Sequence, residues 1–136
     1  QAVARENLKQ FDNVIIEQAE GEHLPLPDGS LEAVFANMYL HHCPDPRAAI
    51  AEMVRVLRPG GRVVVSDVVA DHALAPGTRR DPQRWAACEA GAVTMEEYVS
   101  LMSAAGFEGV RAERKGAYRE GLSRAVVRGV KPRDSR

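Results

Sequence analysis

The chain has 136 residues, a formal net charge of −1 and 45% hydrophobic residues. A chain of this length and composition can bury one hydrophobic core, so we expect a single domain. Its apolar runs are only a few residues long, which argues against a membrane-spanning helix, and its first residues lack the pattern of a secretory signal peptide.

The cysteines and the charge distribution narrow the class of protein further. Cys43 and Cys88 lie far apart and do not form a disulfide framework, so we expect a protein of the reducing cytoplasm. Residues 108–136 carry nine Lys or Arg against four Asp or Glu, whereas residues 1–107 carry nine against fifteen. The basic part lacks interleaved aromatic residues and a recognisable nucleic-acid module, so we expect neither a nucleic-acid nor a membrane partner.

The N-terminal part contains two candidate elements. Residues 1–11, QAVARENLKQF, are typical of the later turns of a helix, with the apolar residues loosely on one side. No capping residue opens this helix, which suggests a chain cut from a longer one. NVIIEQAE, at 13–20, is an apolar run rich in β-branched residues and predicts a buried strand. The prolines of HLPLPDG, at 23–29, then predict a turn-rich connection.

A strand–helix–strand unit follows. LEAVFANMYL, at 31–40, predicts a second strand. Asp45 and Pro46 are a strong helix start, because a carboxylate can cap the helix and proline suits its first position. The helix should end before a Pro-Gly-Gly turn, and the valine-rich RVVVSDVVA, at 62–70, predicts a parallel strand that is covered on both faces. Together these elements predict a right-handed βαβ crossover.

The last part of the chain predicts a long connection, a helix and two strands. Residues 71–93 are broken by proline and glycine, and loops of this length usually cover or bind something. Thr94 opens a helix through a capping box, and Gly106 closes it. Residues 108–115 and 122–131 alternate between polar and apolar positions, which indicates a pair of antiparallel strands. We therefore expect an α/β fold.

Several short motifs occur in a fixed order between residues 24 and 61. They are LPLPD, LHH, Asp45-Pro46, Glu52 and LRPGG. In this order and spacing they resemble the second half of a class I S-adenosylmethionine-dependent methyltransferase. The resemblance implies a Rossmann-like, mostly parallel sheet with a C-terminal antiparallel strand pair. It also implies a methyltransferase enzyme, with S-adenosyl-L-methionine as its cofactor and a small molecule as its methyl acceptor.

The resemblance assigns cofactor-binding roles to four residues. Glu20 matches an acidic residue that bonds the adenine amino group, and Gly21 would offer its backbone N–H. Asn37 and Met38 match the strand end whose backbone lies along the methionine part of the cofactor. Ligands of open parallel sheets bind at the carboxyl ends of the strands, where Glu20, Asn37 and Asp67 are expected to lie.

Tyr39 and His41 match the wall beside the transferred methyl group, and we take them as the catalytic candidates. His41 would act as a general base if the acceptor is an O–H or N–H group, and a structural histidine is an equal alternative. The neighbouring His41, His42 and Cys43 do not predict a metal site, because adjacent side chains point in different directions and no second ligand pair follows.

One part of the family's pattern is absent. No Gly-x-Gly turn occurs in the sequence, and neither of the first two strands of the family's sheet is recognisable. The resemblance therefore implies that residues 1–136 are a single partial domain, the C-terminal part of a methyltransferase, without the N-terminal cofactor-binding half. We expect the isolated chain to be inactive.

Within the family, the stretch after residue 84 is most similar to arsenite methyltransferases. Cys88, which precedes Gly91-Ala92, matches one of their metalloid-binding cysteines. Trp85 is either a lid contact at the acceptor site or hydrophobic cover, and the two alternatives are equal. Met38 occupies the position of a second such cysteine and cannot form a thiolate. We therefore expect an organic small molecule rather than arsenite as the acceptor.

Two further functions remain open. The chain could be a non-catalytic interaction or regulatory fragment, stabilised by a partner that supplies the missing strands. Independently of this alternative, unpaired sheet edges would favour a homodimer. A nicotinamide-dependent oxidoreductase is disfavoured, because the Gly-x-Gly-x-x-Gly fingerprint is missing.

Overall fold

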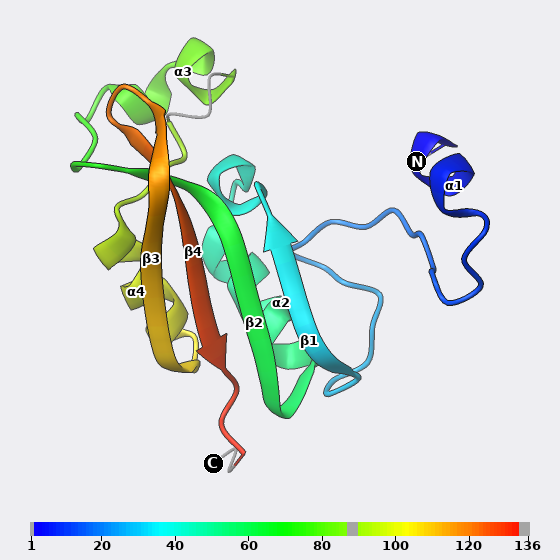
Figure 1. The fold of residues 1–136 in the computed structure, drawn as a ribbon. Coiled ribbons are helices and arrows are strands. Elements are labelled where there is room, and N and C mark those ends of the chain that lie inside the picture. The colour runs from blue at the N-terminus through cyan, green and yellow to red at the C-terminus, as the bar shows by residue number, and fades with distance from the viewer. Residues whose placement is uncertain (1, 87–89, 134–136) are drawn as a thin grey trace.

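The computed structural model of the chain describes residues 2–86 and 90–133. Figure 1 shows one sheet with helices beside it. The elements are, in chain order, α1 (Ala2–Leu8), β1 (Leu31–Asn37), the 3₁₀ turn η1 (Leu40–His42), α2 (Pro46–Val56), β2 (Leu57–Ala70), the 3₁₀ turn η2 (Thr78–Arg80), α3 (Pro82–Ala86), α4 (Met95–Ala104), β3 (Glu108–Arg119) and β4 (Leu122–Val130).

The sheet has the strand order β1-β2-β4-β3. β1 and β2 are parallel, with Asn37 opposite Ser66, and the chain passes between them through α2. β4 is antiparallel to both β2 and β3. The α/β class, the strand–helix–strand unit and the C-terminal antiparallel pair are therefore confirmed, and the sheet of the described residues is mixed.

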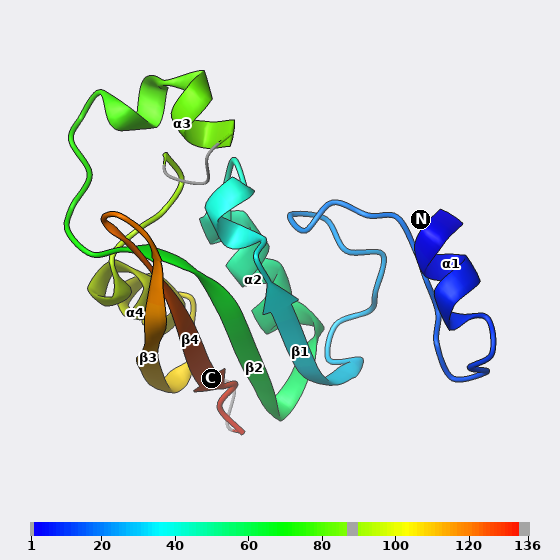
Figure 2. The ribbon, with the colours of Figure 1, turned by 45° about the horizontal axis from the view of Figure 1, so that its top comes forward.

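The strand predicted at 13–20 is wrong. Residues 14–19 carry no strand assignment, and Glu20 forms only an isolated bridge to His23. A strand needs a neighbour for its backbone N–H and C=O groups, and this segment pairs with no strand of the sheet. Ile15 is consequently 85% exposed. In Figures 1 and 2 this segment and α1 lie to one side of the sheet, and none of α1 is buried.

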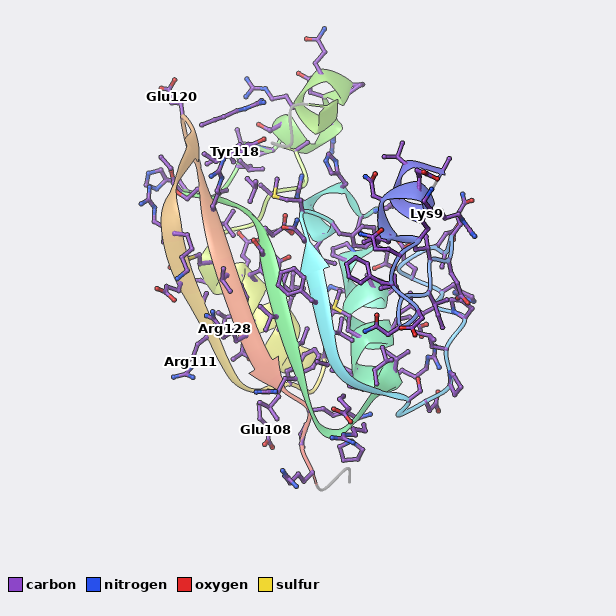
Figure 3. The ribbon with its side chains drawn as sticks, turned by 45° about the vertical axis from the view of Figure 1, so that its right-hand side comes forward. Lys9, Glu108, Arg111, Tyr118, Glu120 and Arg128 are labelled. Atoms are coloured by element: carbon purple, nitrogen blue, oxygen red, sulfur yellow. The ribbon has the colours of Figure 1, made fainter. Side chains whose placement is uncertain are left out.

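The two longer helices, α2 and α4, lie on the same face of the sheet (Figures 1 and 2). The core lies between them and the strands, and its members include Ile50, Met53, Val63, Val65, Met102 and Val127. The other face is more open, since Phe35 is 70% exposed. Figure 3 shows Arg111 and Arg128, which are register partners on β3 and β4.

Burial along β2 differs from the prediction that the strand is covered on both faces. From Arg62 to Ser66, buried positions alternate with exposed or partly buried ones, whereas Asp67 to Ala70 are all buried. A second apolar cluster covers this last part, and it contains Val68, Ala70, Ala92 and Leu122 with Met38, Leu74 and Tyr118 packed against them. The strand is thus covered on both faces only near its carboxyl end.

Capping sets the start of α2, and a crowded bend follows its end. The Asp45 carboxylate accepts a hydrogen bond from the backbone N–H of Ala48 at 3.1 Å, as expected for an N-cap. β2 begins directly after the helix, and the Pro-Gly-Gly turn lies inside an irregular part of its pairing with β1. A Cβ added to Gly61 would lie 2.8 Å from the carbonyl oxygen of Arg58, so the bend requires glycine there.

The segment from 71 to 93 and the helix after it agree with their predicted outline. The connection contains η2 and α3, two short helical turns. The Thr94 hydroxyl caps α4 by accepting a hydrogen bond from the backbone N–H of Glu97 at 3.2 Å. Within the described residues, no helix combines the length and the apolar character needed to cross a membrane.

Candidate functional site

The carboxyl end of β1 is held in a tight turn. Met38, directly after the strand, has a φ of 54°, which is unusual for a residue other than glycine. Its backbone N–H donates to the carbonyl of Ser66 on β2 at 2.8 Å, which stabilises this conformation. Asn37 remains exposed at the strand end. Backbone strain of this kind occurs at functional sites, so the end of β1 is a candidate site.

Tyr39 attaches the loop around Gly21 to the turn after β1. The Tyr39 hydroxyl accepts a hydrogen bond from the backbone N–H of Gly21 at 3.2 Å and donates one to Oε2 of Glu22 at 3.4 Å. A Cβ on Gly21 would lie 2.6 Å from the Tyr39 ring, so only glycine allows this approach. Burial raises the pKa of Tyr39 to about 12, and the phenol is therefore protonated at neutral pH.

Cys43 completes this cluster. Its thiol is buried and donates to Oε1 of Glu22 at 2.8 Å. This hydrogen bond lowers the pKa of the Glu22 carboxyl. Burial, assisted by the hydrogen bond to Glu22, raises the pKa of the Cys43 thiol. Cys43 is therefore a protonated, structural cysteine rather than a thiolate.

A second polar cluster lies deeper, between η1, β2 and α4. Asp67 is 1% exposed and accepts a hydrogen bond from the hydroxyl of Tyr98 at 2.7 Å. It also accepts from the backbone N–H groups of His41 and Val68, and its Oδ1 is hydrogen-bonded to Nδ1 of His41. Burial, followed by the negative charge of Asp67, raises the pKa of Tyr98 well above its usual range. His41 is buried as well, at 2% exposed.

The exposed His42 lies against His41, with the two ring centroids 4.0 Å apart. Partial burial of the His42 ring, which disfavours its charged form, lowers the pKa of His42. Its ring is therefore neutral at neutral pH.

Arg55 of α2 anchors the connection that precedes β1. Its guanidinium donates to the carbonyl oxygens of Leu26 at 2.7 Å and Leu24 at 3.0 Å, and it pairs with Glu52 through two nitrogens. Glu52 in turn accepts from the backbone N–H of Leu24 at 2.8 Å. The LPLPD motif is thus held on α2 by the Glu52–Arg55 pair.

The structure brings together some of the predicted site residues and separates others. Gly21 and Tyr39 are in contact, whereas Glu20 is exposed in the loop before them. Cys88 lies outside the described residues. Trp85 belongs to α3, but its side chain is also outside the description. Among the described residues, no three His, Cys, Asp or Glu side chains form a group that could hold a metal ion.

Sequence reasoning did not find the roles of Glu22 and Tyr98. Glu22 carries no motif, so no sequence signal marks it. Tyr98 is buried in α4, and a buried tyrosine usually needs a partner for its hydroxyl. That rule could have indicated a polar partner in the core, although not its identity.

Comparisons with known proteins agree with the resemblance seen in the sequence. Residues 1–65 match the family model described as a methyltransferase domain. The chain is 36% identical over 122 residues to an arsenite methyltransferase of Halobacterium salinarum, covering 88% of this chain and 31% of the relative. It is 36% identical over 110 residues to a 27-O-demethylrifamycin SV methyltransferase of Amycolatopsis mediterranei, covering 79% of this chain and 40% of the relative.

The fold leads to the same family. The structure of an arsenic(III) S-adenosylmethionine methyltransferase from Chlamydomonas reinhardtii matches with a TM-score of 0.74 and 27% identity, over 96% of this chain and 48% of that chain. The chain thus spans less than half the length of each of these three relatives. Its sequence and its fold are similar to those of S-adenosylmethionine-dependent methyltransferases.

Proposed function

We propose that this chain takes part in the transfer of a methyl group from S-adenosyl-L-methionine to a small organic acceptor. The observation that carries the proposal is its alignment, over most of its length, with two curated methyltransferases. Residues 1–136 would then be a single partial domain that corresponds to the C-terminal portion of a methyltransferase. The protein would act in the cytoplasm.

The loop 20–23 and the end of β1 would form one side of the cofactor site. When bound, the cofactor would supply a positively charged sulfonium whose methyl carbon the acceptor can attack, with S-adenosylhomocysteine as the leaving group. Glu20 and Asn37 are exposed polar residues next to glycine or a strained turn, which fits the binding of a polar nucleoside. The N–H of Gly21 is bonded to Tyr39, so an adenine at this N–H would have to replace the tyrosine hydroxyl. Met38 would contribute its backbone.

The two catalytic candidates would have different roles. Tyr39 is protonated at neutral pH, so it cannot remove a proton from the methyl acceptor, and it can donate a hydrogen bond to that acceptor once its hydroxyl turns away from Glu22. His41 is buried, and its Nδ1 is bonded to Asp67. A general base must reach the proton that it removes. We therefore assign Tyr39 to acceptor orientation and His41 to support of η1.

An organic acceptor fits the described residues better than arsenite does. Trivalent arsenic is held by converging thiolates, because a soft ion prefers soft anionic ligands. Cys43 is buried, protonated and bonded to Glu22, and Met38 offers only a thioether. The rifamycin relative is named for an organic acceptor. Trp85 and Cys88 would contact the acceptor from the 71–93 segment.

A second candidate function is a non-catalytic binding fragment that forms a homodimer. It is favoured by the unpaired outer edge of β1 and by exposed apolar residues such as Ile15 and Phe35. Exposed edges and apolar surface promote association between copies.

The test uses the full product of the gene, with labelled S-adenosylmethionine and titration of S-adenosylhomocysteine. We expect micromolar binding and transfer of label to a small organic acceptor, with little transfer to arsenite. Tyr39→Phe should lower the transfer rate about tenfold, the value of one hydrogen bond. Tyr118→Phe, a partly buried tyrosine on β3, is the matched control. Absence of both binding and transfer would refute the proposed function and favour the homodimer.

A further inference from the structure

Asp67 is an ionised carboxylate, as its hydrogen bonds require. A carboxylate has about four lone-pair sites and no donor. The backbone N–H of His41 and the Tyr98 hydroxyl donate to Oδ2. The N–H of Val68 donates to Oδ1, which Nδ1 of His41 also contacts. Three donors other than the His41 ring converge on Asp67, which indicates an ionised carboxylate with no proton to give to Nδ1. The proton of the His41–Asp67 contact then belongs to Nδ1. This assigns the tautomer of His41 from the hydrogen-bond network.

The other ring nitrogen of His41 has no partner. Among the buried side-chain nitrogen and oxygen atoms of the described residues, Nε2 of His41 is the one without a hydrogen bond. The His41 side chain is only 1% exposed, so bulk water does not reach it. A buried polar atom left unpaired costs about 1–3 kcal/mol, and native proteins usually fill such sites with a protein group or an ordered water.

A cavity of about 20 Å³ adjoins this histidine. Two residues of the polar cluster, His41 and Tyr98, line this cavity. The rest of the lining is mostly apolar and consists of Leu40, Pro46, Ile50, Gly91, Val93 and Leu101. A cavity needs about 10–15 Å³ to hold one water molecule, and that water needs two to four polar partners. The space is therefore large enough for a single water and too small for a methyl acceptor.

We propose that this cavity holds one water molecule that donates hydrogen bonds to Nε2 of His41 and to the hydroxyl oxygen of Tyr98. The Tyr98 proton is committed to Asp67, so its oxygen can accept. The water closes a ring in which Asp67 accepts from His41 and Tyr98, and the water donates to both. His41 and Tyr98 are then positioning residues that join η1 to α4. This inference rests on the cluster alone and does not depend on methyl transfer.

The ring makes two measurable predictions about the 136-residue chain. In long-range proton–nitrogen NMR spectra near neutral pH, His41 should carry its proton on Nδ1 and none on Nε2. Water–protein cross-relaxation should reveal a long-lived water at the His41 ring protons. A His41 imidazole protonated on Nε2, or the absence of a long-lived water beside it, would overturn the proposal. A high-resolution crystal structure with an empty cavity would do the same.

A pair of matched variants tests whether the water occupies this cavity. Val93→Ile places an extra methyl group in the cavity lining, so it should remove the water signal while Nδ1 of His41 stays protonated. Val99→Ile makes the same change at a partly buried position that does not line the cavity, and it should leave the signal intact. Loss of the signal in both variants, or in neither, would contradict the assigned site.

Discussion

Asp67→Asn tests the ionised, fully bonded state of Asp67 most directly. Asparagine has the same shape, but one of its two terminal atoms is an NH₂ group, which cannot accept a hydrogen bond. If NH₂ replaces Oδ2, it faces the backbone N–H of His41, and the Tyr98 hydroxyl must rotate to accept. If it replaces Oδ1, it faces the N–H of Val68, and His41 must change tautomer. Either orientation leaves at least one buried N–H without an acceptor.

The cost follows from these contacts. One unpaired buried donor costs about 1–3 kcal/mol, and the bonds that survive lose the strengthening that a charged acceptor provides. We expect a decrease of about 3 kcal/mol in the free energy of unfolding, a large part of the roughly 5–15 kcal/mol of a typical domain. Tyr98→Phe removes one of the four donors and should cost only about 1 kcal/mol.

Urea unfolding followed by circular dichroism measures these differences, provided that the dependence of the free energy on urea is unchanged. Asp12→Asn, at an exposed position outside both clusters, is the control and should stay within about 0.5 kcal/mol of the unchanged chain. An Asp67→Asn chain as stable as this control would refute the view that Asp67 is an ionised acceptor of four donors.

Two further predictions concern other parts of the chain. The hydrogen bonds from Arg55 and from the N–H of Leu24 lower the pKa of Glu52 to about 2 from 4.5. The contribution of the Glu52 carboxylate to stability is therefore complete above pH 4.5 and is lost as the pH falls towards 2. Glu52→Gln should lose less stability than the unchanged chain over this pH range in acid unfolding, and an unchanged acid transition would contradict the Arg55 anchor. Gly61→Ala should lower the melting temperature markedly in calorimetry, because the added Cβ would lie 2.8 Å from a carbonyl oxygen. Gly77 has open space around it, so Gly77→Ala should leave the melting temperature nearly unchanged. Equal effects of the two substitutions would refute the crowded bend at Gly61.

Much of the local structure of this chain could be predicted from the sequence. Asp45 before Pro46 and Thr94 before Glu97 are capping patterns that act within one turn, and both helices begin where these patterns place them. The alternation of polar and apolar residues in 122–130 likewise predicted a strand. Successive side chains of a strand point to opposite faces, so this alternation in the sequence determines which face is buried. These features require only neighbouring residues.

The failure at 13–20 has a tertiary cause. Val14 to Ile16 have the composition of a strand, but no strand of the described chain pairs with their backbone, and they remain mostly exposed. A β-branched run is suited to a strand but does not form one without a neighbour, because strand hydrogen bonds join different segments.

The candidate site was only partly visible in the sequence for the same reason. The motifs marked Gly21, Tyr39 and His41 through a resemblance. Only the packing of η1, β2 and α4 joined His41 to Asp67, 26 residues away, and Tyr98 to Asp67, 31 residues away. Local sequence determines which helices and turns can form, since caps and turns involve residues a few positions apart. Which buried carboxylate receives which donors depends on how those elements pack, and this only the tertiary structure decided.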